Sequence, residues 1–109
     1  MTSPDSLPQS PSALFTPTQW EALAPYLDDQ QCVKTWPSKR NKKSVQMLVL
    51  RYLASKLEPG TKYSEREINQ LLQKHHTFGD PALLRRELFE SGLVNRTRDG
   101  FSYWLHESN

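Results

Sequence analysis

Residues 64–105 read SEREINQLLQKHHTFGDPALLRRELFESGLVNRTRDGFSYWL, and this stretch decides the fold. Ser64, followed three residues later by Glu67, has the form of an N-terminal capping box, so a helix is expected to begin there. Further on, Asp80 and Pro81 are the residue types preferred at the cap and at the first position of a helix. Apolar residues follow both starts at helical spacing: Ile68, Leu71 and Leu72, then Leu84 and Leu88. The stretch therefore predicts two short helices joined by a tight turn.

The end of the same stretch predicts a β-hairpin. Residues 93–98 and 101–105 alternate apolar and polar side chains around Asp99-Gly100, which is a strong short-range hairpin signal. Arg96 and Arg98 lie two positions apart, so they share one face of the first strand near the hairpin tip. The side chains expected to point inward are Val94, Tyr103 or Trp104, and Leu105.

A longer helix is predicted ahead of these elements, over residues 38–57. Its apolar face has the clearest helical periodicity in the chain: Val45, Leu48, Val49, Tyr52, Leu53 and Leu57. Four bases lie in its first turn and the preceding coil, although cations there oppose the positive end of the helix dipole. They are Lys39, Arg40, Lys42 and Lys43. Because a bound anion would offset this unfavourable interaction with the dipole, we interpret the four residues as a phosphate-contact patch. The alternative is that they only make the surface more soluble.

The N-terminal part has a different composition. Residues 1–17 contain four of the eight prolines, among serine, threonine and glutamine. This arm is expected to be disordered, because it buries too little apolar surface to offset its chain entropy. Residues 18–33 predict a short helix and a linker, with a capping box from Thr18 to Glu21, or an alternative start at Thr16. We expect this helix either to dock on the main domain as a lid, or to contact a second copy of the chain or another protein.

Charge is distributed very unevenly along the 109 residues. All 14 lysine and arginine residues lie within residues 34–99 together with seven acidic residues, which gives that segment a net charge of +7. Residues 1–33 carry four acids and no base. A basic body behind an acidic arm indicates a polyanionic partner, or an arm that folds back on its own body. A solvated surface is the plainer alternative.

The sequence lacks several patterns that would indicate a secreted or membrane protein. The single Cys32 excludes an internal disulfide and fits a reducing compartment. No apolar run reaches the ~20 residues that cross a bilayer, and the first residues lack the basic and apolar regions of a signal peptide. We therefore expect a cytoplasmic protein without membrane contact, and a nucleoid-associated location is compatible with that.

Neither metal binding nor catalysis is predicted. His75 and His76 are adjacent, and neighbouring positions on a helix point apart, so even with His106 or Cys32 no zinc-site spacing results. A glycine-rich phosphate loop and a nucleophile–base arrangement are also missing from the sequence. We expect no metal, no cofactor and no enzymatic activity.

Four groups of residues, taken in order, also resemble a known family. They are Pro37-x-Lys39-Arg40-x-Lys42-Lys43, Tyr63-Ser64-Glu65-x-Glu67-Ile68-Asn69, Leu84-Arg85-Arg86-x-Leu88 and Asp99-Gly100-x-x-Tyr103-Trp104. Over residues 34–105 the chain is similar to the bacterial family called domain of unknown function 2087. Members of that family occur alone or appended to helix-turn-helix transcriptional regulators, notably of the arsenic-repressor type. The resemblance therefore implies a role in gene regulation.

Together the elements predict an α+β, mainly α fold. It is a winged helix-turn-helix over residues 34–106, with three helices, a C-terminal β-hairpin wing and an extra N-terminal helix. The second of the two short helices occupies the position of a recognition helix, and two arginines lie in its middle. The hypothesis that follows is a small transcriptional regulator that binds double-stranded DNA. Its contact residues would be Lys39, Arg40, Lys42, Lys43, Arg85, Arg86, Arg96 and Arg98.

Two other classes of function stay open. The scaffold also suits a protein-interaction adaptor in transcription, because a fold does not fix a function, or a binder of structured RNA. The arrangement of the arginines discriminates between them. Nucleic acid is favoured if the basic helix start, the recognition-position helix and the hairpin share one face. The adaptor is favoured if Arg85 and Arg86 are held in ion pairs.

Overall fold

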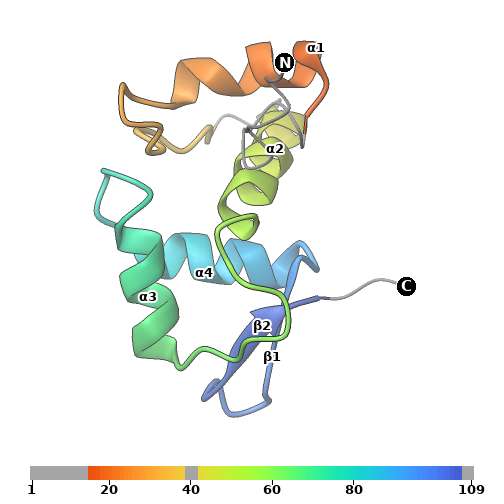
Figure 1. The fold of residues 1–109 in the computed structure, drawn as a ribbon, viewed down its shortest axis with the longest axis vertical. Helices are drawn as coiled ribbons and strands as arrows, with labels where there is room; N and C mark the ends of the chain where they lie inside the picture. The colour runs from red at the N-terminus through yellow and green to blue at the C-terminus, as the bar shows by residue number, and fades with distance from the viewer. Residues whose placement is uncertain (1–14, 39–41, 107–109) are drawn as a thin grey trace, which may run out of the picture.

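The computed structural model describes residues 15–38 and 42–106 (Figure 1). Within these residues the fold is α+β and mainly helical, with four α-helices and one two-stranded antiparallel sheet. The elements in chain order are α1 (Pro17–Leu23), the 3-10 helix η3 (Ala24–Tyr26), α2 (Lys43–Ala54), α3 (Glu65–Gln73), α4 (Pro81–Glu90), β1 (Val94–Arg96) and β2 (Tyr103–Leu105). The predictions for residues 1–14 and for Lys39 and Arg40 lie outside the described residues.

The capping signals predicted for α3 and α4 are confirmed. The Ser64 hydroxyl accepts from the Glu67 N–H at 3.0 Å, and the Glu67 carboxylate accepts from the Ser64 N–H at 2.9 Å. At α4 the Asp80 carboxylate accepts from the Leu83 N–H at 3.1 Å, and Pro81 is the first helical residue. These bonds satisfy N–H groups that a helix start leaves without an intrahelical partner.

At α1 the alternative start is the real one. Thr16 and Gln19 form the capping box, in which the Thr16 hydroxyl accepts from the Gln19 N–H at 3.1 Å. The box predicted from Thr18 to Glu21 is wrong, because Thr18 already lies inside the helix. The deciding residue is Pro17, whose fixed φ suits the first helical position.

α1 packs on α2, as the lid interpretation predicts (Figure 1). Pro25 lies in η3, where the α-helix gives way to a single 3-10 turn. Leu23 is fully buried and Phe15 is 4 % exposed. The guanidinium carbon of Arg51 lies 4.9 Å from the centre of the Phe15 ring, which fixes the start of α1 against α2.

α2 is shorter than the helix predicted over residues 38–57. After Ala54 the chain tightens, and the Leu57 N–H donates to the Ala54 carbonyl at 3.1 Å. Leu57 is buried all the same, because the tight turn keeps it on the apolar side. Leu50 lies off the predicted apolar face and is nevertheless buried, since α4 packs against this part of α2.

α4 occupies the middle of the fold, where it contacts α2, α3 and β1. One connected core gathers buried side chains from the α-helices and from β1: Leu23, Leu53, Ile68, Leu72, Leu84, Leu88 and Val94. Burial of one such side chain stabilises the fold by about 1.5–3 kcal/mol, so α4 is held by its own two leucines and by those of its neighbours. Among the described helices none is both long and apolar enough to cross a bilayer.

The linker after η3 runs beside the turn that joins α3 to α4. Val33 forms an antiparallel bridge with Leu27 and a parallel bridge with His76. The Val33 N–H donates to the His75 carbonyl at 2.8 Å, and the Val33 carbonyl accepts from the Thr77 N–H at 2.9 Å. The N-terminal segment is thus tied by backbone hydrogen bonds to the turn between α3 and α4.

His76 holds the same turn from inside. Its ring is 5 % exposed and meets the Phe78 ring edge at a centroid distance of 4.6 Å. Nδ1–H donates to the Leu72 carbonyl at 2.7 Å, and Nε2 accepts from the Asp80 N–H at 2.9 Å. These two bonds require the neutral imidazole and occupy both ring nitrogens.

β1 and β2 are shorter than predicted, and the loop between them is longer than the two-residue Asp99-Gly100 turn. The reason is Thr97, whose hydroxyl accepts from the backbone N–H groups of Phe101 and Ser102 at 3.1 and 3.2 Å. Gly100 has φ +78° within this loop. The paired residues are Val94↔Leu105, Asn95↔Trp104 and Arg96↔Tyr103.

The segment before α3 joins the hairpin. Tyr63 and Tyr103 exchange two backbone hydrogen bonds of 2.8 Å and form an antiparallel bridge beside β2. The Tyr63 hydroxyl also accepts from the Glu58 N–H at 2.9 Å, just after α2 ends. The hairpin is therefore fixed to the helices on the β2 side.

The Ser64 cap can be tested by its removal. We expect Ser64→Ala to lower the free energy of unfolding by about 1 kcal/mol, because the Glu67 N–H loses its acceptor. Urea unfolding measures the change. Ser44→Ala, at an exposed position in the first turn of α2, is the matched control and should stay within about 0.5 kcal/mol of the parent. Equal losses in the two variants would contradict the assignment of the cap.

His75 gives the turn a pH dependence. Burial, followed by the charges of Lys56 and Lys74, lowers the pKa of His75. The unfolded chain then binds this proton more readily, so the stabilisation is complete above the unfolded pKa of about 6.5 and is lost as the pH falls through the lower folded pKa. We expect His75→Gln to reduce the fall in unfolding free energy between about pH 8 and pH 5. Urea titrations at each pH measure it, and an unchanged slope would refute this role of His75.

Candidate functional site

A groove lies between the outer side of α4 and the hairpin. It encloses about 280 Å³ and is lined by Ala82, Arg85, Arg86, Phe89, Glu90, Arg96 and Tyr103. The first five come from α4, and the last two are paired residues of β1 and β2. Three arginines against one glutamate give the groove an excess of positive charge.

Arg96 crosses the groove from β1 to α4. Its guanidinium carbon lies 4.4 Å from the centre of the Phe89 ring, a cation–π contact, while the residue as a whole remains exposed. Nη1 also lies 3.4 Å from the carbonyls of Thr97 and Arg98, to which it donates. The contact with Phe89 orders the guanidinium at the protein surface, and no described acidic residue forms an ion pair with it.

Arg85 turns away from solvent toward α3. Its Nη1 donates to the Asn69 side-chain oxygen at 2.6 Å and lies 3.6 Å from a Glu65 carboxylate oxygen. Its guanidinium carbon is 5.8 Å from the centre of the Tyr103 ring. The Arg85 side chain is 19 % exposed, against 56 % for Glu65. Arg85 therefore joins α3, α4 and β2 through contacts within the protein.

Arg86 and Arg98 have different surroundings from Arg85. Arg86 is exposed on α4 and lines the groove. Arg98 is exposed in the loop at the hairpin tip. Neither takes part in an ion pair within the described residues. Of the four arginines predicted to contact a ligand, Arg86, Arg96 and Arg98 keep exposed positions around α4 and the hairpin.

The start of α2 is separate from this groove. Lys42 caps α2 without a side-chain hydrogen bond to the helix. Lys43 lines a different hollow, together with Glu87 and Glu90 of α4. In Figure 1 the start of α2 lies toward one end of the long axis, and the hairpin tip lies toward the other. The structure therefore brings Arg85, Arg86 and Arg96 together without Lys42 and Lys43.

The hairpin tip carries an exposed aromatic residue in an ordered loop. Phe101 is 74 % exposed. The Thr97 hydroxyl donates to the Asp99 carboxylate at 2.6 Å, and the Phe101 N–H donates to the same carboxylate at 3.1 Å. These bonds, first that from Thr97 and then that from Phe101, lower the pKa of Asp99, so the tip also carries one negative charge.

Two aromatic residues of this region were missed by the sequence reasoning. Phe89 is not among the residues that the sequence predicts to contact a ligand, but it follows Arg86 by three positions and so lies on the same side of α4. Phe101 was assigned to a strand, although a residue directly after Asp99-Gly100 is close to the hairpin tip whatever the loop length. Helical spacing could have found Phe89, whereas the exposure of Phe101 depends on the longer loop.

The different surroundings of the two neighbouring arginines predict different stabilities. We expect Arg85→Ala to lower the free energy of unfolding by about 1–2 kcal/mol, because a charge-assisted hydrogen bond to Asn69 is lost. Arg86→Ala should change it by less than about 0.5 kcal/mol. Urea unfolding of both variants and of Asn69→Ala measures this, with the double variant giving the coupling. Equal effects at the two arginines would contradict the structural role of Arg85.

Comparison with protein families matches residues 32–105 to the family described as an uncharacterized protein conserved in bacteria, DUF2087. The match covers more than half of the 109 residues and runs from Cys32, directly before the Val33 bridges, to the end of β2. Comparisons with curated proteins and with solved structures gave no significant match. The resemblance of the four sequence motifs is thus confirmed, and the chain belongs to the bacterial family called domain of unknown function 2087.

Proposed function

We propose that the protein is a small winged-helix DNA-binding protein that acts in transcriptional regulation. The observation that carries the proposal is the groove between α4 and the hairpin, around which Arg86, Arg96 and Arg98 are exposed. Exposed guanidinium groups on a helix and on an adjacent hairpin are suited to base edges and phosphates of one duplex. A cytoplasmic location belongs to this proposal.

The order of the elements supports the winged-helix interpretation. α2 is followed by the Tyr63 bridge, by α3 and α4 around a short turn, and by the β1–β2 hairpin. In this interpretation α4 is the recognition helix, and the hairpin is the wing that lies along the sugar-phosphate backbone. The bond between Tyr63 and Tyr103 fixes the wing next to the start of α3.

We assign different tasks to the arginines. Arg86 faces the major groove from α4, and Arg98 follows the backbone from the wing tip. Arg96 is ordered by Phe89 before any ligand arrives, so less side-chain entropy is lost when its planar fork binds phosphate. Arg85 is a positioning residue, because its guanidinium is already engaged with Asn69 and Glu65.

The lysines at the start of α2 have a smaller part in this proposal. Lys43 does not line the groove but shares a hollow with Glu87 and with Glu90, which also lines the groove, so acidic neighbours reduce its attraction for phosphate. A single domain of this size would make few base contacts, and tight recognition of one sequence would then require two copies. Because α1 already packs on α2, such a dimer would use the exposed side of α1.

The proposal is tested by fluorescence anisotropy with the full chain and labelled random duplex DNA, across a salt series. We expect a Kd on the order of micromolar at low salt and steep weakening as salt rises. Arg96→Gln and Arg98→Gln should each reduce the slope of log K against log salt by about 0.9, the value for one lost phosphate contact. Lys34→Gln removes one charge at an exposed position far from the groove in sequence and is the matched control.

Two results would overturn the proposal. One is the absence of duplex binding at low salt by a protein whose circular dichroism shows it to be folded. The other is an equal loss in Lys34→Gln, which would mean that net charge alone decides binding. A labelled RNA hairpin in the same titration tests structured RNA, and tighter binding of the hairpin would replace the duplex as the ligand.

A protein-interaction adaptor is the second candidate. Phe101, 74 % exposed on an ordered loop, favours it, because aromatic residues at exposed tips are frequent anchors in protein interfaces. The engagement of Arg85 within the fold favours it as well. The adaptor predicts a folded protein without salt-dependent duplex binding, so the same titration separates the two candidates.

A further inference from the structure

The face of the hairpin that points away from α4 carries a second hollow. It encloses about 320 Å³ and is lined by Gly60, Lys62, Asn95, Trp104, Leu105 and His106. Asn95 and Trp104 are directly paired across the two strands, and they alternate with Arg96 and Tyr103, which line the groove toward α4. The hollow is therefore distinct from the groove assigned to DNA.

Trp104 forms the aromatic surface of this hollow. Its side chain is only half-buried, although it lies within a sheet. The Lys62 ammonium lies 5.0 Å from the centre of the indole ring, and no acidic residue is among the lining residues. A partly exposed indole next to a cation that has no ion pair among the described residues is able to stack on a planar ring and to attract a negative group.

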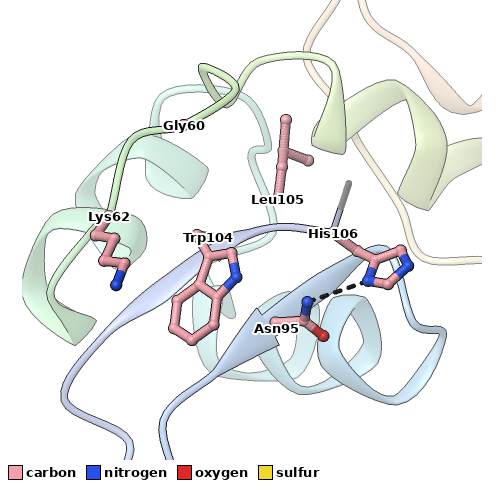
Figure 2. Close-up of a pocket in the computed structure, with 6 residues that line it drawn as sticks. All are labelled: Gly60, Lys62, Asn95, Trp104, Leu105 and His106. Atoms are coloured by element: carbon pink, nitrogen blue, oxygen red, sulfur yellow. Dashed lines mark hydrogen bonds between the residues drawn. The ribbon is translucent and has the colours of Figure 1, made fainter. Parts of the chain in front are cut away.

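Polar groups lie on the other side of the indole. The Asn95 side-chain N–H donates to His106 Nδ1 at 3.1 Å, and in the neutral imidazole Nε2 then carries the proton. Figure 2 shows the indole ring between the Lys62 side chain and the Asn95–His106 pair. The hollow thus has one cation, an N–H donor and an aromatic surface, all on short elements tied together by Tyr63 and Tyr103.

We propose that this hollow binds a planar aromatic small molecule with one negatively charged group. The ring would stack on Trp104, the negative group would pair with Lys62, and an acceptor atom would meet His106. Lys62 is exposed and has a flexible stem, so its ammonium can leave the indole face for the ligand anion. A volume of about 320 Å³ is at the lower end for ligand sites, which fits a molecule of one or two rings.

A second lysine–aromatic contact in the same protein provides an internal comparison. The Lys56 ammonium lies 4.7 Å from the centre of the Tyr52 ring. Tyr52 is only 1 % exposed, so no ligand can stack on it. Lys62 and Lys56 therefore make contacts of the same kind, and only the former has an accessible ring beside it.

The test uses NMR of the uniformly ¹⁵N-labelled full chain, titrated with 2-naphthoate. The three tryptophans give three indole N–H signals, and Trp104→Phe assigns the relevant one. We expect a saturable shift of the Trp104 signal, with the Trp20 and Trp36 signals unchanged. Lys62→Gln should weaken binding about fivefold, the size of one exposed charge pair, and Lys56→Gln should leave it unchanged.

Neutral 2-naphthamide and adenosine monophosphate complete the titration. Naphthamide should bind about fivefold more weakly than naphthoate, because it lacks the charge that pairs with Lys62. Tighter binding of naphthoate than of the nucleotide identifies aromatic carboxylates as the ligand class, and the reverse identifies nucleotides. The proposal is overturned if Trp104 does not shift, if all three indoles shift alike, or if Lys62→Gln and Lys56→Gln have equal effects. It holds or fails independently of DNA binding.

Discussion

The pair of backbone hydrogen bonds between Tyr63 and Tyr103 is the constraint on which the arrangement of the hairpin depends. Tyr63 lies directly before the cap of α3, and its hydroxyl also binds the backbone just after α2. Tyr103 pairs with Arg96 across the hairpin, and its ring lies near the Arg85 guanidinium. One pair of residues thus fixes the hairpin relative to three helices. The groove on one side of β2 and the hollow on the other both lie next to this connection.

Adjacent arginines on α4 have unlike environments for a geometric reason. Successive residues of a helix point about 100° apart, so Arg85 faces α3 while Arg86 faces outward. Asn69 and Glu65 lie on the facing side of α3 and bind the first of them. Neither of the two simple alternatives, both arginines exposed or both in ion pairs, describes the molecule. The exposed positive charge of the groove is consequently smaller than the sequence indicates, and it depends more on β1.

Local rules explain how much of the fold was predictable. The caps at Ser64 and Asp80 need only residues within one helical turn, so sequence patterns were sufficient for them. At α1 two threonines offered the same motif, and only the position of Pro17 decided between them. The hairpin loop is longer than predicted because the Thr97 hydroxyl accepts hydrogen bonds from backbone N–H groups. The Asp99-Gly100 pattern does not include this interaction. Periodicity alone does not show that Lys43 lies near the acidic residues of α4. It also does not show that Arg85, rather than Arg86, contacts α3. Both depend on how the helices pack.

The alternation of side chains along β2 has a consequence for how the two surfaces interact. Tyr103 and Trp104 are consecutive residues on opposite faces of a strand only three residues long. A molecule that moves the backbone at Trp104 would therefore also move Tyr103 and, through it, the partner Arg96. Thermodynamic linkage makes any such influence reciprocal. If a ligand in the hollow changes the affinity of the groove for its ligand by some factor, the groove ligand changes the affinity of the hollow by the same factor. The one interior residue of this strand is Trp104 itself, which lines the hollow.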